Sequence, residues 1–191
     1  TGNGSTTAAA VNNGSSDACG IQSLALSQTA FTCANVGSNT VTLTVTDVNG
    51  NQSQCTATVT VQDLVAPVAV CQPVTVQLDN TGNGSTTAAA VNNGSSDACG
   101  IQTLSLSQTA FTCASIATNP NPVTLTVTDV NGNQSQCTAT VTVQDLVAPV
   151  AVCQPVTVQL DNTGNGSTTA AAVNNGSSDA CGIQTLSLSQ T

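Results

Sequence analysis

The chain repeats itself along its length, and this feature constrains its fold more than any other. Residues 1–80 return as residues 81–162 and begin again at Thr163, with a shift of 80 and then of 82 residues. The extra residues of the second copy lie within Thr118–Pro122, which reads TNPNP in place of SNT. Repetition this close is typical of tandem arrays, in which copies supply length, valency or stiffness. The sequence therefore predicts a tandem surface protein, of which this chain is an excerpt.

Cysteine is the residue that can stabilise such short repeats. A unit of about 80 residues buries too little apolar surface to be stable without covalent or metal cross-links. The chain has nine cysteines, four in each full repeat, and it has no histidine. This pattern, without the paired spacing of zinc sites, indicates disulfides formed in an oxidising compartment. We therefore expect an extracellular protein, with an odd cysteine count because the repeats are cut at both ends.

The charged residues exclude several classes of function. The net charge is −9, and the chain contains no lysine, arginine or histidine. A nucleic-acid partner requires a basic surface that neutralises phosphates, so the sequence predicts none. No run of about 20 apolar residues is present, so we expect no membrane insertion of this segment. No conventional base is available to activate a serine or cysteine nucleophile, so the chain is not expected to be an enzyme.

Alternating apolar and polar residues predict strands rather than helices. In the copy from Pro67 to Asp145, valine, leucine, alanine or cysteine alternates with threonine or glutamine at 74–78, 123–128 and 137–143. Further strands of small residues are expected at 85–91, 101–107 and 111–116, with Gly- and Asn-rich turns between them. Threonine and valine suit a pleated, half-buried surface. Several short strands spaced about ten residues apart are typical of a β-sandwich, so we expect an all-β chain.

Three sequence blocks carry a resemblance to a known family. They are DLVAPVAVCQPVTVQLD, SSDACGI and NPVTLTVTDVNGNQSQCTATVTVQD. The blocks resemble the hyalin-repeat (HYR) family in its bacterial form. That resemblance implies immunoglobulin-like β-sandwich domains in a linear array within long secreted proteins, including cell-surface adhesins of gliding and biofilm-forming Bacteroidetes. The expected domains are 1–63, which lacks its first strand, then a complete repeat at 64–145, and the N-terminal part of a third at 146–191.

The implied topology also suggests how the cysteines pair. Four cysteines in a repeat allow three connectivities. The first and last strands are neighbours in an immunoglobulin-like sandwich, which favours a Cys71–Cys137 bridge. The remaining cysteines of that repeat would form Cys99–Cys113, and the same scheme gives Cys19–Cys33. Three cysteines are then left with partners outside the excerpt: Cys55, Cys153 and Cys181.

The same topology brings acidic side chains together where one repeat meets the next. The residues expected at the first such meeting point are Asp63, Asp97 and Asp129, with Asn131 and Asn133 nearby, and those expected at the second are Asp145 and Asp179. Converging carboxylates without any cation are unfavourable unless a metal compensates them. Calcium takes six to eight oxygen ligands of these types, so we expect interdomain calcium. The alternative is that these aspartates cap turns and keep the surface soluble.

The linkers indicate the function we expect. The sequence QDLVAP at 62–67 and 144–149 is short, contains proline and lacks glycine, which restricts bending. The linkers therefore predict a stiff structural stalk, and the resemblance to hyalin repeats implies that it belongs to a long extracellular adhesin or surface filament, used for attachment at the cell surface and in gliding motility. Its partners would be the neighbouring repeats of the same chain and other copies of itself.

Two other functions stay open at this stage. The chain could be a laterally self-assembling surface sheath, with threonine-rich faces packed against one another. It could also be a glycan- or ice-binding module that uses polar loops or flat threonine rows. A glycan site usually carries an exposed aromatic platform, and this chain has only two aromatic residues, Phe31 and Phe111.

Overall fold

The computed structural model describes residues 2–190, which are mostly β-structure, with 41% strand and 10% helix. The packing divides the chain into two compact units. The first comprises Thr1–Val68, Ser96–Thr103 and Val127–Ser135, and the second comprises Ala69–Ser95, Leu104–Thr126 and Gln136–Thr191. Each unit therefore contains residues from more than one sequence repeat. The domain boundaries that the sequence suggests stay a prediction.

The elements follow the repeat. Those of the first repeat are β1 (Asn3–Ser5), α1 (Ala8–Val11), β2 (Ile21–Leu26), β3 (Ala30–Thr32), a 3-10 turn at Cys33–Asn35, β4 (Gly37–Asp47) and β5 (Gln52–Val61). Those of the second repeat are β6 (Val74–Gln77), β7 (Asn83–Ser85), α2 (Ala88–Val91), β8 (Ile101–Leu106), β9 (Ala110–Thr112), α3 (Ala114–Ala117), β10 (Asn121–Asp129) and β11 (Gln134–Gln144). The third repeat contributes α4 (Ala170–Val173).

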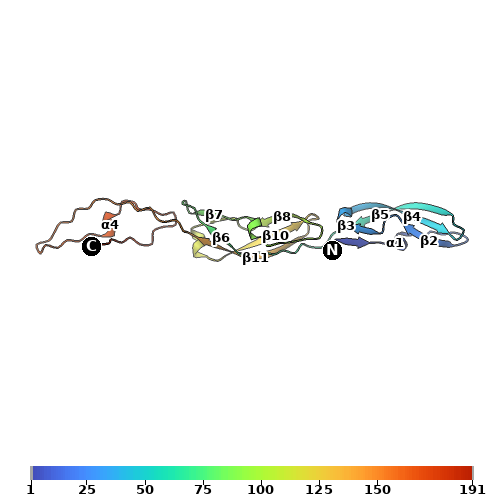
Figure 1. Ribbon diagram of the computed structural model, residues 1–191, viewed down its shortest axis with the longest axis horizontal. Coiled ribbons are helices and arrows are strands. Elements are labelled where there is room, and N and C mark those ends of the chain that lie inside the picture. The colour runs from blue at the N-terminus through green and yellow to red at the C-terminus, as the bar shows by residue number, and fades with distance from the viewer. Residues whose placement is uncertain (1, 191) are drawn as a thin grey trace. The chain divides into compact units, whose positions relative to one another are not determined.

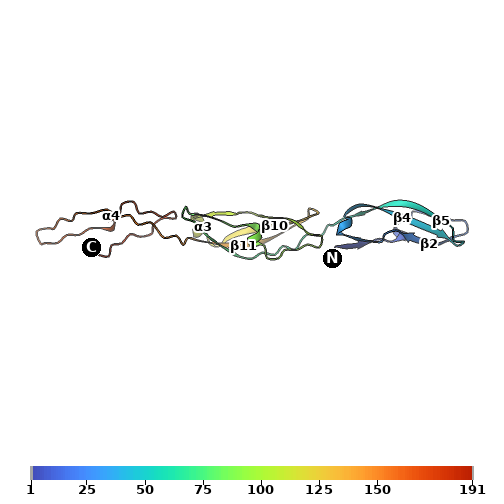
Figure 2. The same cartoon turned by 45° about the horizontal axis from the view of Figure 1, so that its top comes forward.

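The strands form two larger and two smaller sheets. The order is β2-β4-β5 in one sheet and β6-β11-β10-β8 in another, while β1 pairs with β3 and β7 pairs with β9. In the first repeat, β4 and β5 run side by side as a long antiparallel hairpin (Figures 1 and 2), with Gly37 opposite Val61 and Thr46 opposite Gln52. In the second repeat, β6 adds to β11 as a parallel strand, with Val74 opposite Val141. The sheet of the first repeat has no equivalent of β6 within residues 2–190.

The core is built from the alternating positions that the sequence marks. On β10, the side chains of Val123, Leu125 and Val127 are at most 1% exposed, and the threonines between them are half-buried. The neighbouring strand β11 buries Ala139, Val141 and Val143 in the same way. This two-residue period is what a strand with one buried face requires. The strands predicted at 74–78, 123–128 and 137–143 are therefore confirmed.

Two predicted strands are wrong over part of their length. The segment predicted at 85–91 ends its strand at Ser85 and forms the helical turn α2 over Ala88–Val91. Three consecutive alanines favour helix, and the Thr87 hydroxyl accepts a hydrogen bond from the Ala90 N–H at 3.2 Å, which caps the turn. The segment predicted at 111–116 likewise becomes β9 followed by the helical turn α3. Local propensity overrides the strand pattern at both places.

The third repeat has the fewest regular elements. Besides α4, isolated bridges pair Val150 with Ser178 and Cys153 with Asn174. The same bridges occur in the second repeat, between Val68 and Ser96 and between Cys71 and Asn92. Over residues 2–190, no helix has both the length and the apolar character needed to cross a bilayer.

Candidate functional site at the repeat junctions

Disulfides connect successive sequence repeats. Cys33, which opens the 3-10 turn after β3, is bonded to Cys99 of the next repeat, 66 residues away, with a Cα–Cα distance of 5.1 Å. The equivalent residues one repeat later, Cys113 and Cys181, are bonded across 68 residues with the same Cα–Cα distance of 5.1 Å. Each bridge lies inside one compact unit. We call Cys33, Cys99, Asp63 and Asp97 the first junction, and Cys113, Cys181, Asp145 and Asp179 the second junction.

These bridges correct the predicted pairs Cys19–Cys33 and Cys99–Cys113. A disulfide needs Cα atoms within about 7 Å. Cys19 lies before strand β2, and Cys33 follows β3, which pairs with β1 rather than running back along β2. Six residues of extended strand span about 20 Å. The two cysteines therefore lie at opposite ends of that strand. Cys99 and Cys113 flank β8 and β9 in the same way, and each is bonded to a neighbouring repeat instead.

The third predicted pair is formed. Cys71 is bonded to Cys137, with a Cα–Cα distance of 5.9 Å and a sequence separation of 66 residues. Cys71 precedes β6 and Cys137 lies on β11, and these two strands are adjacent in the sheet. In the part of the chain that the structure describes, three cysteines have no disulfide partner, and all are exposed: Cys19, Cys55 and Cys153.

A glycine makes room for each junction disulfide. A Cβ atom at Gly82 would lie 2.6 Å from the Cys113 Sγ and 3.3 Å from the Ala180 Cβ. Gly82 also has a φ of +75°, a backbone conformation that other residues rarely adopt. Gly2, its equivalent in the first repeat, has a φ of +59° and would place a Cβ 2.5 Å from the Cys33 Sγ. The turn before β7 or β1 therefore packs directly on the disulfide and on the alanine that precedes the second cysteine.

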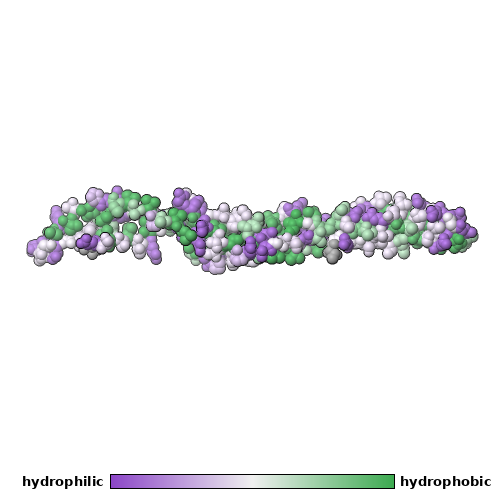
Figure 3. All heavy atoms as spheres, viewed as in Figure 1, coloured by the Kyte–Doolittle hydropathy of each residue, from purple (hydrophilic) through white to green (hydrophobic). Residues whose placement is uncertain are grey.

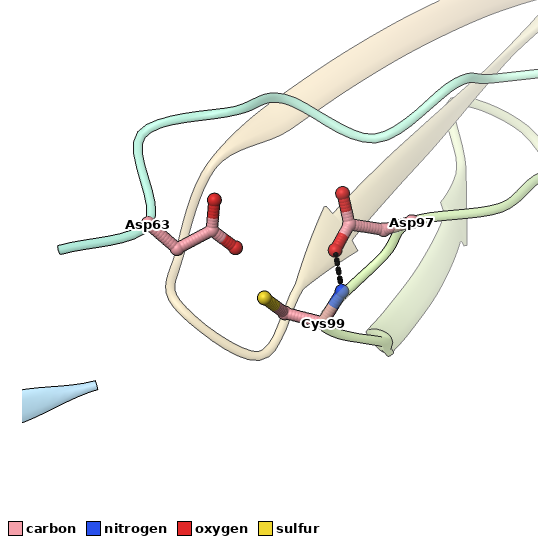
Figure 4. A group of neighbouring side chains, drawn as sticks. All are labelled: Asp63, Asp97 and Cys99. Carbon is pink, nitrogen blue, oxygen red and sulfur yellow. Dashed lines mark hydrogen bonds between the residues drawn. The ribbon is translucent and has the colours of Figure 1, made fainter. Parts of the chain in front are cut away.

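Two carboxylates meet beside the first disulfide (Figure 4). Oxygen atoms of Asp63 and Asp97 and the sulfur of Cys99 lie within 4.8 Å of one another. The Asp97 Oδ1 accepts hydrogen bonds from the N–H groups of Cys99 (2.7 Å) and Gly100 (3.2 Å). The Asp63 Oδ1 accepts one from Val65 (3.1 Å), while its Oδ2 is buried and has no hydrogen-bond partner. The second junction groups Asp145, Asp179 and Cys181 in the same way.

Asp129 occupies a separate place, in the turn between β10 and β11. Its side chain is 0% exposed. Its Oδ1 accepts the N–H groups of Asn131 (2.9 Å) and Asn133 (2.8 Å), and its Oδ2 accepts the Asn133 side-chain amide at 2.8 Å. Burial raises the pKa of this carboxyl, but the hydrogen bonds from Asn133, Asn131 and Gly132 outweigh burial and hold the pKa below its ordinary value. The Asp129 carboxylate therefore stabilises the turn between β10 and β11.

Asn133 connects that turn to the first junction. Its side-chain amide donates to the Asp129 carboxylate and also to the backbone oxygen of Asp63, at 3.1 Å. The predicted group of Asp63, Asp97, Asp129 and Asn131 is thus only partly brought together, because Asp63 groups with Asp97, and Asp129 does not join that group. Asn131 contributes its backbone N–H to the turn. The asparagine that reaches the junction is Asn133, which directly follows Gly132 and was expected near this group.

A cleft of about 200 Å³ opens beside the first junction. Its walls include the β1 residue Gly4, the β3 residue Phe31, the β5 residue Val61 and the linker residue Leu64, together with Val36. Polar residues also line it, among them Asn3, Gln62 and Asp63. No cationic side chain lines it, since the whole chain lacks lysine, arginine and histidine.

Comparison with known proteins found no family model and no curated protein that matches this chain.

Proposed function

We propose that this chain is a structural stalk segment of a long extracellular adhesin or surface filament, built of tandem immunoglobulin-like domains. The observation that carries the proposal is the disulfide between successive repeats, Cys33–Cys99, and its recurrence as Cys113–Cys181. A bridge within one domain stabilises that domain, whereas a bridge between repeats also fixes the connection that a stalk must maintain under tension. Three disulfides are typical of proteins from oxidising compartments, which supports an extracellular setting.

The three bridges overlap along the chain. Cys71–Cys137 begins inside the loop closed by Cys33–Cys99 and ends inside the loop closed by Cys113–Cys181. In the chain-entropy model, each loop of 66 or 68 residues stabilises the folded state by about 4 kcal/mol. Because the loops overlap, almost no stretch between Cys33 and Cys181 can be drawn out while the bridges hold. This arrangement suits a filament that transmits force.

The resemblance to hyalin repeats supports the same function. Members of that family occur in large secreted adhesins, and the three blocks that resemble it keep their order in this chain. The repeats would extend a distal binding tip from the cell surface in attachment or gliding. The chain has no histidine, lysine or glutamate to activate a serine or cysteine nucleophile, which supports a role without catalysis.

Stretching single chains held at their two ends tests the stalk proposal. The oxidised chain should keep its length as force rises, and the same chain should lengthen stepwise after reduction with a phosphine. A chain that extends equally far in both states would contradict the proposal, because its length would then depend on domain folding alone.

We also propose that calcium binds at the junctions and stiffens them. The buried Oδ2 of Asp63 lacks a hydrogen-bond donor and lies near the Asp97 carboxylate, and no cationic side chain exists to compensate the two charges. Calcium binds carboxylate oxygens, and water would complete its coordination. The Cys99 sulfur is in a disulfide and supplies no thiolate, so the protein ligands would be Asp63 and Asp97.

Thermal unfolding with calcium chloride and with EGTA tests this second proposal. Calcium should raise the melting temperature of the native chain, and Asp97→Asn should reduce that rise. Asp17→Asn is the matched control, because the Asp17 carboxylate accepts the same turn hydrogen bond from the Cys19 N–H, at 2.8 Å, and is not part of a metal-type group. Equal calcium responses in the two variants would exclude the junction as the binding site, and magnesium in place of calcium would show whether the effect is a general charge effect.

A further inference from the structure

Asparagine is followed by glycine at three places in the second repeat: Asn83-Gly84, Asn93-Gly94 and Asn131-Gly132. This dipeptide can react with itself, because the glycine nitrogen can attack the neighbouring side-chain amide. Glycine has no side chain to hinder the approach, and the nucleophile and its target belong to one chain, so the step is intramolecular. The reaction requires an accessible asparagine side chain and a glycine N–H that no hydrogen bond holds.

Two of the three pairs fail the second requirement. In the turn between β10 and β11, the Gly132 N–H donates to the Asp129 backbone oxygen at 3.3 Å. Gly84 lies in the middle of β7, in the antiparallel ladder with β9. The Thr86 N–H at the end of this ladder donates to the Thr109 oxygen at 2.9 Å. Because hydrogen-bonded pairs alternate along an antiparallel ladder, the Gly84 N–H is held as well.

The pair in the loop between α2 and β8 is different. Hydrophilic residues lie at the surface in every part of the chain (Figure 3), and both Asn93 and Gly94 are exposed. Within residues 2–190, no oxygen atom accepts the Gly94 N–H, and the Asn93 side chain makes no hydrogen bond. A Cβ atom at Gly94 would meet no atom within 4 Å, so there is room for the two groups to react.

The same arrangement recurs in the other repeats. The loop pair has two copies in the chain: Asn13-Gly14 and Asn175-Gly176. Both asparagines are exposed, and in the part of the chain that the structure describes neither glycine N–H has an acceptor. The hairpin turn of the first repeat again differs from the loop, because the Gly50 N–H donates to the Asp47 oxygen at 3.1 Å. The place in the repeat therefore decides which asparagines can react.

We propose that Asn93 and its two copies are sites of spontaneous deamidation, at which the following glycine converts the asparagine into aspartate and isoaspartate. The asparagines of the hairpin turns, Asn49 and Asn131, are the protected sites. The inference rests on the hydrogen bonds of the loops and turns, and it does not depend on the stalk function or on calcium.

Solvent supplies the other reactants, which are hydroxide and water. Hydroxide removes the Gly94 N–H proton, the nitrogen attacks the Asn93 Cγ, and a C–N bond forms while the bond to the side-chain nitrogen breaks. That nitrogen takes a proton from water and leaves as ammonia, and a cyclic succinimide remains. Hydroxide then opens the ring at one of its two carbonyl carbons, which gives aspartate in one case and isoaspartate in the other. Each event adds one negative charge, and nothing is oxidised or reduced.

Isoaspartate would break a contact that the loop makes. The Ser95 Oγ accepts the Val70 N–H at 2.9 Å and donates to the Val70 oxygen at 3.2 Å, directly before Cys71. Isoaspartate runs the backbone through its side chain and inserts one more carbon atom before residue 94, so Ser95 shifts relative to Val70. Aspartate keeps the normal backbone and adds only the charge. Isoaspartate therefore releases Val70, and aspartate does not.

Ageing the oxidised full chain in mildly alkaline buffer tests the site. Samples taken over time are reduced, digested with Asp-N and fragmented in a mass spectrometer, which assigns each new acid to a residue. Peptides 79–96 and 161–178 share one sequence and report the loops, while 47–62 and 129–144 share another and report the hairpin turns. A new aspartate at residue 93 creates a further Asp-N site, whereas isoaspartate does not, so the digest also separates the two products.

The loop asparagines should deamidate at least tenfold faster than the turn asparagines in the folded chain, because only the turns protect the glycine N–H. The reduced chain in denaturant is the matched control, since it has the same dipeptides without the fold, and there the two sites should react at similar rates. Equal rates for Asn93 and Asn131 in the folded chain would overturn the proposal. So would a loop that stays unmodified while the denatured chain reacts.

Hydrogen exchange tests the release of Val70. The aged chain should exchange the amides of residues 68–72 faster than the fresh chain does, because the Val70 N–H has lost the Ser95 hydroxyl. The double variant Asn93→Asp and Asn175→Asp has the added charge in a normal backbone, and it should exchange like the fresh chain. An aged chain that exchanges no faster than this variant would contradict the effect assigned to isoaspartate.

Discussion

Removal of one junction disulfide should change how far the chain can be stretched. The perturbation is the double substitution Cys33→Ser and Cys99→Ser, which deletes the first junction bridge and leaves Cys71–Cys137 and Cys113–Cys181 in place. The quantity of interest is the fully extended length between residue 33 and residue 181, which are separated by 148 residues along the chain.

The native bridges make this length short. The shortest covalent path crosses from Cys33 to Cys99, follows the 14 residues to Cys113 and crosses to Cys181. At about 3.5 Å per residue those 14 residues span about 49 Å, and each bridge adds a Cα–Cα distance of 5.1 Å. The oxidised chain therefore cannot exceed about 60 Å between these points, compared with about 520 Å for the same 148 residues without bridges.

The double variant should reach an intermediate length. Its shortest path runs from residue 33 to Cys71, crosses to Cys137, returns to Cys113 and crosses to Cys181. That path is about 230 Å long at about 3.5 Å per residue, a gain of about 170 Å over the native chain. This gain is much smaller than the gain from breaking all three bridges, because the Cys71–Cys137 loop overlaps the loops of both junction bridges.

Optical-tweezer or atomic-force stretching, with handles at both termini, measures these contour lengths. The handles and the terminal residues contribute equally to every variant, so the differences report the bridges alone. Reduction with a phosphine should bring native and variant chains to the same maximum. An oxidised native chain that extends by about 290 Å between these points would match bridges within repeats, at Cys19–Cys33 and Cys99–Cys113, and would refute the reasoning.

Three further predictions concern stability. Gly84→Ala should destabilise the second repeat by about 1–3 kcal/mol, because the added Cβ atom would lie 2.6 Å from a methyl carbon of Val76. The equivalent substitution Gly4→Ala should change the unfolding free energy by less than about 0.5 kcal/mol, measured by denaturant titration. Thr87→Ala removes the cap of α2 and should cost about 1 kcal/mol in the same assay. The pKa of Asp129 is lower in the folded state, so its carboxylate contributes stability above the unfolded pKa of about 3.9, and this stability is lost as the pH falls through the folded pKa. Melting temperatures measured from neutral to acid pH should therefore fall less steeply for Asp129→Asn than for the native chain.

The sequence predicted the long strands because burial alternates along them. Valine, leucine and alanine at 123–127 and 139–143 face the core at every second position, and a one-residue shift would expose all of them. The Cys71–Cys137 pair could also be predicted, because its two cysteines lie on strands that the implied topology makes adjacent. These inferences depend on local periodicity or on neighbouring strands.

The other two disulfides could not be predicted by the same reasoning. Pairing by elimination assumed that each repeat satisfies its own cysteines, whereas Cys33 and Cys113 are each bonded to the following repeat. One signal was present in the sequence: the 66-residue separation of Cys33 and Cys99 equals that of Cys71 and Cys137. Spacing alone does not reveal that β3 turns toward β1 and carries Cys33 away from Cys19.

The acidic residues show the same division between local and long-range information. Asp63 and Asp97 come together because a linker and a loop meet at the junction. Asp129 was expected with them, but its carboxylate is satisfied within four residues by Asn131 and Asn133. An aspartate side chain readily accepts hydrogen bonds from the backbone N–H groups of the residues that follow it, which forms a turn. That aspartates cap turns was the competing interpretation. The sequence therefore identified the right region but also indicated Asp129 and Asn131, which belong to the turn.

The most direct test of a stalk held together by bridges between repeats is to map those disulfides. Trypsin has no site in a chain without lysine or arginine, but Asp-N cleaves before each of the nine aspartates. Under non-reducing conditions, peptides 17–46, 97–128 and 179–191 should remain joined as one species, held by Cys33–Cys99 and Cys113–Cys181. Recovery of 17–46 and 97–128 as separate peptides, each closed by its own internal disulfide, would contradict it.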